Sequence, residues 1–182
     1  YTLGNLFHYG FADLTRLSAF YRDLTVSAGE DGQPELSFRD LTAAQVFSKW
    51  SLRQSHWFVS DDDRFFMQAL ADLLRFAIRT GAITKDDLLL TEPSVLAKLT
   101  ADPTCARYWA QYRRITGTCA GKTPPEHTYA VRVRAKKRHI NPLVQTHSGM
   151  KRQTELDEGF AAQLRAYLQD DFDRFVWASF AD

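Results

Sequence analysis

Residues 36–81 read LSFRDLTAAQVFSKWSLRQSHWFVSDDDRFFMQALADLLRFAIRTG, and they decide the fold of this chain. The pattern predicts a short polar entry and one helix from about Leu41 to Trp57. A sharp break at Ser60–Asp63 follows, and then a second helix that ends at Gly81. The rest of the chain is expected to pack on this helix pair or to continue from it.

The second helix has the clearest pattern in the sequence. Ser60 is a suitable N-cap, the aspartates after it lie where the helix dipole favours negative charge, and Gly81 can close the helix in a left-handed conformation. Its apolar side chains recur at the three-to-four-residue spacing of one helical face: Phe66, Leu70, Leu73, Leu74 and Ala77.

The segments on either side of the helix pair are shorter. Before it we expect a helix over residues 11–26, a turn-rich loop over 27–34 and a short strand over 35–39. After it we expect three short helices over residues 85–89, 92–99 and 103–115, the last closed by Gly117. The aromatic residues of that last helix, Tyr108, Trp109 and Tyr112, are interpreted as core.

The pattern changes beyond a loop at residues 117–126. Apolar and basic residues alternate from His127 to Ala135, which predicts a strand with one basic face. A helix over 157–168 follows. Residues 174–180 are expected to form a last strand that pairs with 129–136, with a helical tail as the alternative. The fold class is therefore predicted as mainly α, with about six helices and a small antiparallel sheet near the C-terminus. We expect residues 1–120 to form a helical lobe and 121–182 a strand-helix-strand extension packed on it as one compact unit.

The composition narrows the class of protein. The chain is 45% hydrophobic, enough for a sizeable core, and its formal net charge of +1 argues against nucleic acid as a partner. Cys105 and Cys119 show no metal-ligand spacing and are read as reduced thiols, which predicts a cytoplasmic protein. No apolar run approaches the roughly 20 residues that span a bilayer, so no membrane association is expected.

Two local motifs are weak. Residues 117–123, GTCAGKT, resemble a phosphate-binding loop, but they have three residues between the glycines instead of four and are followed by Pro124 and Pro125 instead of a helix. The five histidines show no metal-binding spacing on a helix, and His56 is interpreted as a boundary residue.

The basic run at residues 132–138 is more suggestive. On a strand, alternate side chains project to one side about 7 Å apart, so a phosphate or an acidic partner could dock there. A solvated strand face balanced by nearby acids remains the alternative. The candidate phosphate ligands in this run are Arg132, Arg134, Lys136 and Arg138.

Four segments resemble the deoxynucleotide triphosphohydrolase-like branch of the HD-superfamily phosphohydrolases. Residues 13–23, DLTRLSAFYRD, are similar to the helix that follows the family's metal-binding core, and residues 49–57 are similar to the next helix. Residues 86–90, DDLLL, fit the same order. The tail, KRHINPLV at 137–144 and TELDEGF at 154–160, is similar to the ending of bacterial members.

The departures from the family concern its metal site. The chain has no His-Asp dipeptide, and the family's later metal-binding Asp falls at Thr15, a poor ligand for a hard cation. The family's Asp-Tyr pair falls at Ser18 and Ala19, and its Tyr, His and Lys fall at Trp57, Val59 and Ser60. Its phosphate-facing Arg falls at Lys49, which keeps the charge but loses the bidentate fork.

The resemblance implies a region that hydrolyses a nucleotide phosphate ester only if a metal centre is supplied by an N-terminal segment absent from this chain. It implies no cofactor in the chain itself, a divalent metal of the Mn, Mg or Fe type if the catalytic half is present, and nucleotide or self-association as partners. Weak metal candidates are Asp13, His8 and His56. The implied phosphate contacts are Arg16, Arg22, Lys49 and Arg53.

The alternative is a non-enzymatic helical scaffold that binds a protein partner or a nucleotide regulator. The loss of ligand-type residues favours this alternative.

Overall fold

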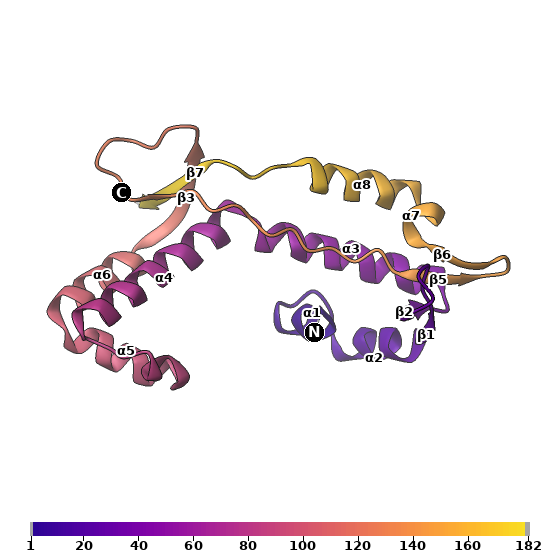
Figure 1. Cartoon of the computed structure of the whole chain (residues 1–182), viewed down its shortest axis with the longest axis horizontal. Coiled ribbons are helices and arrows are strands. Elements are labelled where there is room, and N and C mark those ends of the chain that lie inside the picture. Colours follow the sequence, from indigo (N-terminus) through magenta and orange to yellow (C-terminus); the bar gives the residue numbers. More distant parts are fainter. Residues whose placement is uncertain (1, 181–182) are drawn as a thin grey trace. The chain divides into compact units, whose positions relative to one another are not determined.

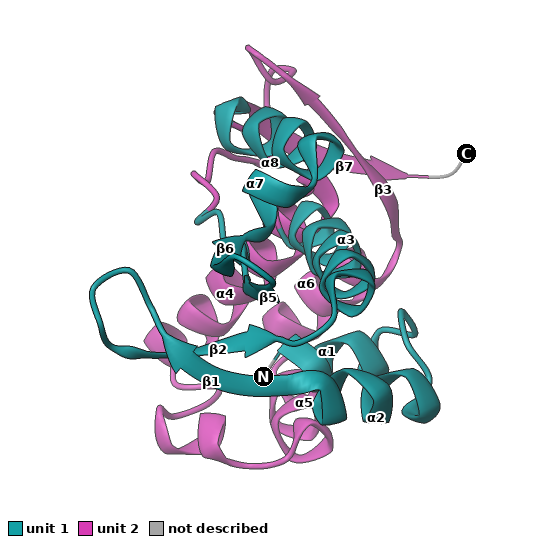
Figure 2. Cartoon of the chain, turned by 90° about the vertical axis from the view of Figure 1, so that its right-hand side faces the viewer, with its two compact units in different colours: residues 1–58, 136–171 teal, residues 59–135, 172–182 magenta. Residues whose placement is uncertain are grey.

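The computed structural model describes residues 2–180 and divides the chain into two compact units, which are coloured separately in Figure 2. Unit 1 comprises Tyr1–Phe58 and Lys136–Asp171, and unit 2 comprises Val59–Ala135 and Phe172–Asp182. The chain therefore leaves unit 1, builds most of unit 2, returns to unit 1 and ends in unit 2. No boundary between the units falls near residue 120.

The predicted fold class is wrong. Within residues 2–180 the chain has eight α-helices and two sheets, of four and three strands, so the class is α+β and not mainly α with one minor sheet. The four-stranded sheet is mixed and begins near the N-terminus (Figure 1). None of the described helices is long and apolar enough to cross a membrane.

Unit 1 combines five helices with the four-stranded sheet. Strands β1 and β2 form an antiparallel hairpin, β2 pairs parallel with β5, and β5 pairs antiparallel with β6. Its elements are α1 (Thr2–His8), α2 (Leu14–Asp23), β1 (Leu24–Ala28), β2 (Pro34–Phe38), α3 (Leu41–Phe58), β5 (Leu143–Thr146), β6 (Gly149–Arg152), α7 (Gln153–Leu156) and α8 (Glu158–Gln169).

The helix predicted over residues 11–26 is too long at both ends. Asp13 caps α2 by accepting a hydrogen bond from the Arg16 backbone N–H, and the chain turns into β1 at Leu24. Thr25 and Val26 are β-branched and pair with β2, so their preference for a strand prevails over the apolar helical face that Leu24 continues.

The core of unit 1 gathers around α3, whose predicted extent is confirmed. Phe20 of α2 and Phe38 of β2 lie against Phe47 of α3, with ring centroids 5.7 and 5.2 Å apart. Leu6 and Val144 are fully buried in the same cluster. Figure 1 shows α8 running alongside α3, and this pairing forms the cavity described below.

Unit 2 is built on α4 (Asp61–Thr80), the second helix of residues 36–81. The predicted caps are confirmed, because Ser60 accepts a hydrogen bond from the Asp63 N–H and Gly81 adopts a left-handed conformation with φ of 81°. The other elements are the 3-10 helix η1 (Asp86–Leu89), α5 (Glu92–Ala101), α6 (Pro103–Arg113), β3 (Ile115–Gly121), β4 (Ala130–Val131) and β7 (Phe175–Phe180).

Two predictions in unit 2 are wrong and one is confirmed. Gly117 does not close a helix, because α6 ends at Arg113 and Ile115–Gly121 is a strand. The strand predicted over residues 127–135 shrinks to Ala130–Val131, so it has no extended basic face. The last strand is confirmed as β7, which pairs antiparallel with both β3 and β4.

A buried arginine holds unit 2 together at the start of α4. Arg64 is 5% exposed, forms an ion pair with Asp61, and donates to the carbonyl oxygens of Val133 and Phe172 at 2.7 and 2.6 Å. Arg174 also binds Asp61, at 3.0 Å. Residues 136–171 belong to unit 1. Arg64 therefore attaches to α4 the segments of unit 2 that lie directly before and directly after them in the sequence.

Candidate functional site

A cavity of about 590 Å³ lies between α3 and α8 in unit 1. Its lining residues on each helix are three and four positions apart, so each helix presents one face to it. From α3 come Lys49, Leu52, Arg53 and His56, and from α8 and its C-cap come Gln163, Ala166, Tyr167 and Asp170.

The floor of this cavity is apolar and rigid. Leu52 is 5% exposed and Tyr167 is 1% exposed, and burial raises the pKa of the Tyr167 hydroxyl. The His56 ring packs edge-on against Tyr167 with centroids 4.7 Å apart. The Tyr167 hydroxyl donates to the Arg138 carbonyl at 3.3 Å, which fixes the ring that supports His56.

The rim of the cavity carries more positive than negative charge. Lys49 and Arg53 are exposed and one helical turn apart, and the carboxylate of Asp170 balances only one of them. The Arg53 guanidinium lies 5.7 Å from the centre of the Phe11 ring, a contact that limits its orientations without using its N–H donors. The arrangement is suited to bind an anionic group such as a phosphate.

The other two implied phosphate contacts on helices do not line this cavity. Arg16 lies over the Trp50 ring at 5.3 Å, and Arg22 donates to the Ser18 carbonyl at 3.2 Å. Both side chains belong to α2 and are exposed. The structure therefore brings together Lys49 and Arg53 but not the full set of four arginines and lysines.

The basic run at 132–138 is not a strand, because the ladder covers only Ala130 and Val131. Arg132 and Arg134 fall in unit 2, whereas Lys136 and Arg138 fall in unit 1. Arg132 forms a two-pronged ion pair with Asp173, with both N–O distances 2.8 Å. The single basic face that the alternation predicted is therefore not formed.

The described residues do not fit the metal that the resemblance implies. Asp13 uses its carboxylate to cap α2, His8 packs edge-on against Phe7, and His56 packs against Tyr167. Among residues 2–180, no three His, Cys, Asp or Glu side chains come together as a metal site. Cys105 is buried, Cys119 is exposed, and both are free.

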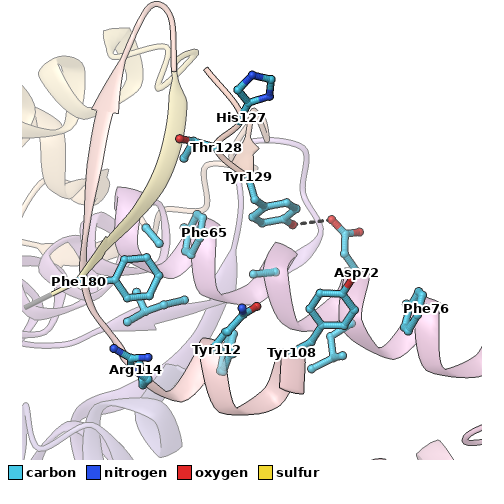
Figure 3. A pocket seen from close by; sticks show the side chains of 15 residues that line it. Phe65, Asp72, Phe76, Tyr108, Tyr112, Arg114, His127, Thr128, Tyr129 and Phe180 are labelled. Carbon is cyan, nitrogen blue, oxygen red and sulfur yellow. Dashed lines mark hydrogen bonds between the residues drawn. The ribbon is translucent and has the colours of Figure 1, made fainter. Parts of the chain in front are cut away.

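Unit 2 contains a second, larger cavity of about 770 Å³ with a very different lining. Figure 3 shows aromatic rings around it, among them Phe65, Tyr108, Tyr112 and Phe180, with the Tyr129 hydroxyl directed at Asp72. No local pattern identifies Asp72 or Tyr129 as site residues, because they are 57 positions apart and meet only through the fold. The spacing on α6 predicts that Tyr108 and Tyr112 share a face. Their interpretation as core residues did not predict that they line a cavity.

Comparison of the chain with protein-family models, with curated proteins and with solved structures gives no match.

Proposed function

We propose that unit 1 binds the phosphate groups of a nucleotide in the α3–α8 cavity. One observation carries the proposal: Lys49 and Arg53 lie one turn apart on α3, at the rim of a single cavity that also holds His56. Lysine and arginine N–H groups donate charge-assisted hydrogen bonds to phosphate oxygens. The resemblance of residues 49–57 to a phosphate-facing helix of HD-superfamily phosphohydrolases supports a nucleotide over other phosphate esters.

The proposal assigns binding, and not hydrolysis, to this chain. Hydrolysis by the chemistry of that family would need a metal centre, which residues 2–180 do not assemble. Such a centre would have to come from another segment or another chain. We assign the function to the cytoplasm, because the two cysteines are free thiols.

The test is a calorimetric titration of the purified chain with thymidine triphosphate and with inorganic triphosphate, using thymidine as the ligand without phosphate. We expect both phosphates to bind and thymidine not to bind at the same concentrations. Charge-assisted hydrogen bonds contribute about 1.5–3 kcal/mol each, so Lys49→Gln/Arg53→Gln should weaken phosphate binding about 100-fold or more.

Matched controls separate this cavity from general positive charge. Arg165 is an exposed arginine of α8 that does not line the cavity, and Arg165→Gln should leave the affinity within about twofold. Arg16→Gln and Arg22→Gln test whether α2 contributes to phosphate binding, as the resemblance implies. An affinity that responds equally to all of these substitutions would contradict a site at Lys49 and Arg53.

A second candidate, self-association or binding of a protein partner, is favoured by a cluster of exposed aromatic residues in unit 1. Tyr9 packs edge-on against Trp57 and Phe58, with ring centroids 4.7 and 5.4 Å apart, yet Tyr9 and Trp57 remain 47% and 45% exposed. Exposed apolar patches often mark interfaces. Sedimentation of the wild-type chain and of Tyr9→Ser/Trp57→Ser tests self-association: a dimer that the variant loses supports it, and a monomer at every concentration contradicts it.

A further inference from the structure

Six of the fifteen side chains that line the larger cavity, in unit 2, are Phe or Tyr. Several of them remain exposed although they are large: Phe180 is 54% exposed, Tyr129 is 51% exposed and Tyr108 is 41% exposed. They come from β7, from the segment before β4 and from α6, while Phe65 and Phe76 come from α4. The three exposed rings therefore come from three separate segments of the chain, and their apolar surfaces meet at this cavity.

These rings are held in position by their neighbours. Phe76 packs edge-on against Tyr108 with centroids 5.4 Å apart, and Phe65 packs edge-on against Tyr129 at 5.9 Å. The Tyr112 hydroxyl donates to the Phe66 carbonyl at 3.3 Å. A site whose walls are already fixed loses little conformational entropy when a ligand enters.

One carboxylate interrupts the aromatic lining. Asp72 Oδ1 accepts hydrogen bonds from Gln68 and Arg75, both at 2.8 Å, whereas Oδ2 accepts from the Tyr129 hydroxyl at 2.7 Å. A carboxylate oxygen can accept two hydrogen bonds, so Oδ2 retains capacity for one more. The side chain is 42% exposed, which leaves it accessible to a ligand.

The charge of Asp72 is already balanced. Burial alone would raise the pKa of Asp72, but hydrogen bonds from Tyr129, Arg75 and Gln68 together hold this pKa below its ordinary value. The carboxyl is therefore ionised near neutral pH, with Arg75 as its counter-ion. A neutral N–H donor suits this oxygen better than a second cation does.

We propose that the unit 2 pocket binds a planar aromatic ligand that carries an amino group, with the ring stacked between aromatic side chains and the amino group donating to Asp72 Oδ2. Ring stacking on aromatic side chains contributes about 1–3 kcal/mol per base in nucleic-acid complexes. A volume of about 770 Å³ lies within the range of small-molecule sites and exceeds what a simple ammonium ion fills. This inference does not rest on the phosphate site of unit 1.

The experiment compares two ligands that differ only in the amino group. Adenosine carries an amino group on its purine ring, and purine riboside does not. Each is titrated calorimetrically into the full chain. We expect adenosine to bind about tenfold more tightly, since one hydrogen bond to a charged acceptor is worth about 1.5–3 kcal/mol and tenfold corresponds to about 1.4 kcal/mol. Equal affinities, or no binding of adenosine, would overturn the proposal.

Two variants assign this difference to the pocket. In Asp72→Asn the amide keeps one oxygen for Gln68 and Arg75, so its NH₂ group replaces Oδ2 and faces the ligand as a donor. Adenosine should then lose its advantage over purine riboside. Phe180→Ala removes an exposed stacking surface and should weaken both ligands about tenfold.

The matched control is Asp86→Asn, which removes an exposed carboxylate of the same unit outside the pocket and should change neither affinity. Far-UV circular dichroism verifies that each variant is folded. If folded Asp72→Asn keeps the wild-type preference for adenosine, the proposal is wrong. Unchanged affinities for both adenosine and purine riboside in folded Phe180→Ala would also contradict it.

Discussion

A cavity in unit 1 and a cavity in unit 2 differ in the chemistry of the side chains that line them. In unit 1 a polar face of α3 brings Lys49 and Arg53 to an anion-binding rim. In unit 2 one face of α4 brings Phe65, Asp72 and Phe76 to a pocket with several aromatic residues. Helical spacing selects a face in both cases, but the residues on that face, and the segment that packs opposite it, decide what can bind.

The units also differ in how an arginine holds distant segments together. Arg64 in unit 2 is buried and binds one carboxylate and two backbone carbonyls. Arg152 in unit 1 is partly exposed and binds two carboxylates, Glu30 at 2.9 Å and Glu35 through two nitrogens. Neither cation is available to a ligand, whereas Lys49 and Arg53 line a cavity. The position of a basic residue in the fold, and not its charge, determines its role.

The largest effect is expected for Arg64→Met. The substitution keeps an apolar stem but leaves the Val133 and Phe172 carbonyls without this buried donor, and it removes one of the two arginines that pair with Asp61. Breaking a buried ion pair costs about 3–5 kcal/mol, so the free energy of unfolding should fall by that amount. Urea denaturation followed by tryptophan fluorescence measures it.

The control for this substitution is Arg132→Met, which breaks the exposed pair with Asp173. Exposed pairs contribute under about 1 kcal/mol, so this variant should unfold close to the wild type. Equal destabilisation by the two variants would contradict the distinction between the buried and the exposed arginine.

A smaller effect is expected for Arg152→Met in unit 1. The side chain is 24% exposed and Glu30 is 76% exposed, so solvent weakens these pairs, although the network also includes the Asn141 carbonyl at 3.2 Å. We expect a loss of about 1–2 kcal/mol in the free energy of unfolding. Hydrogen exchange should localise the change to β1, β2 and β6, and a change spread over unit 2 would be inconsistent with a role confined to unit 1.

The smallest effect concerns acid stability in unit 2. A hydrogen bond from Lys98, with further bonds from Thr84, holds the pKa of Asp87 below its ordinary value. A carboxyl with a lowered folded-state pKa contributes stability above its unfolded pKa of about 3.9, and this stability is lost as pH falls through the folded value. Stability should therefore decline below about pH 4.

Asp87→Asn should flatten this acid dependence, because amide side chains do not titrate. The neighbouring substitution Asp86→Asn is the control and should leave the dependence in place, since Asp86 is exposed. Denaturant titrations at several pH values give the comparison. An acid dependence that is unchanged in Asp87→Asn would show that the Lys98 pair does not contribute.

The sequence predicted the elements whose signals are local. The two helices of residues 36–81 were placed correctly, because periodicity and the caps at Ser60 and Gly81 lie within each segment. The antiparallel pairing of β7 with β4 was predicted, whereas the four-stranded sheet and strand β3 were not, because their pairing is remote: Ser37 pairs with Leu143, and Cys119 pairs with Trp177. Strand β3 reads ITGTCAG, and its two glycines are typical of a loop and not of a strand, so no local signal marks it before its partner is known.

The candidate site residues also differ in how far the sequence predicted them. Lys49 and Arg53 were named from the family resemblance together with Arg16 and Arg22, and one turn of α3 places only these two at one cavity. The predicted basic strand face at residues 132–138 was wrong. The alternation of apolar and basic residues predicted a strand, but only Ala130 and Val131 pair with β7. The pair of Asp72 and Tyr129 depends on the packing of α4 against the segment before β4, which no local pattern encodes.

The most direct measurement is a crossed titration of two ligands against two variants. Inorganic triphosphate and adenosine are each titrated into the wild-type chain, into Lys49→Gln/Arg53→Gln and into Asp72→Asn. The account predicts that the first variant loses only triphosphate binding and that the second weakens only adenosine binding. Triphosphate binding that survives the loss of Lys49 and Arg53, or a single variant that removes both ligands, would contradict the assignment of two distinct sites to the two units.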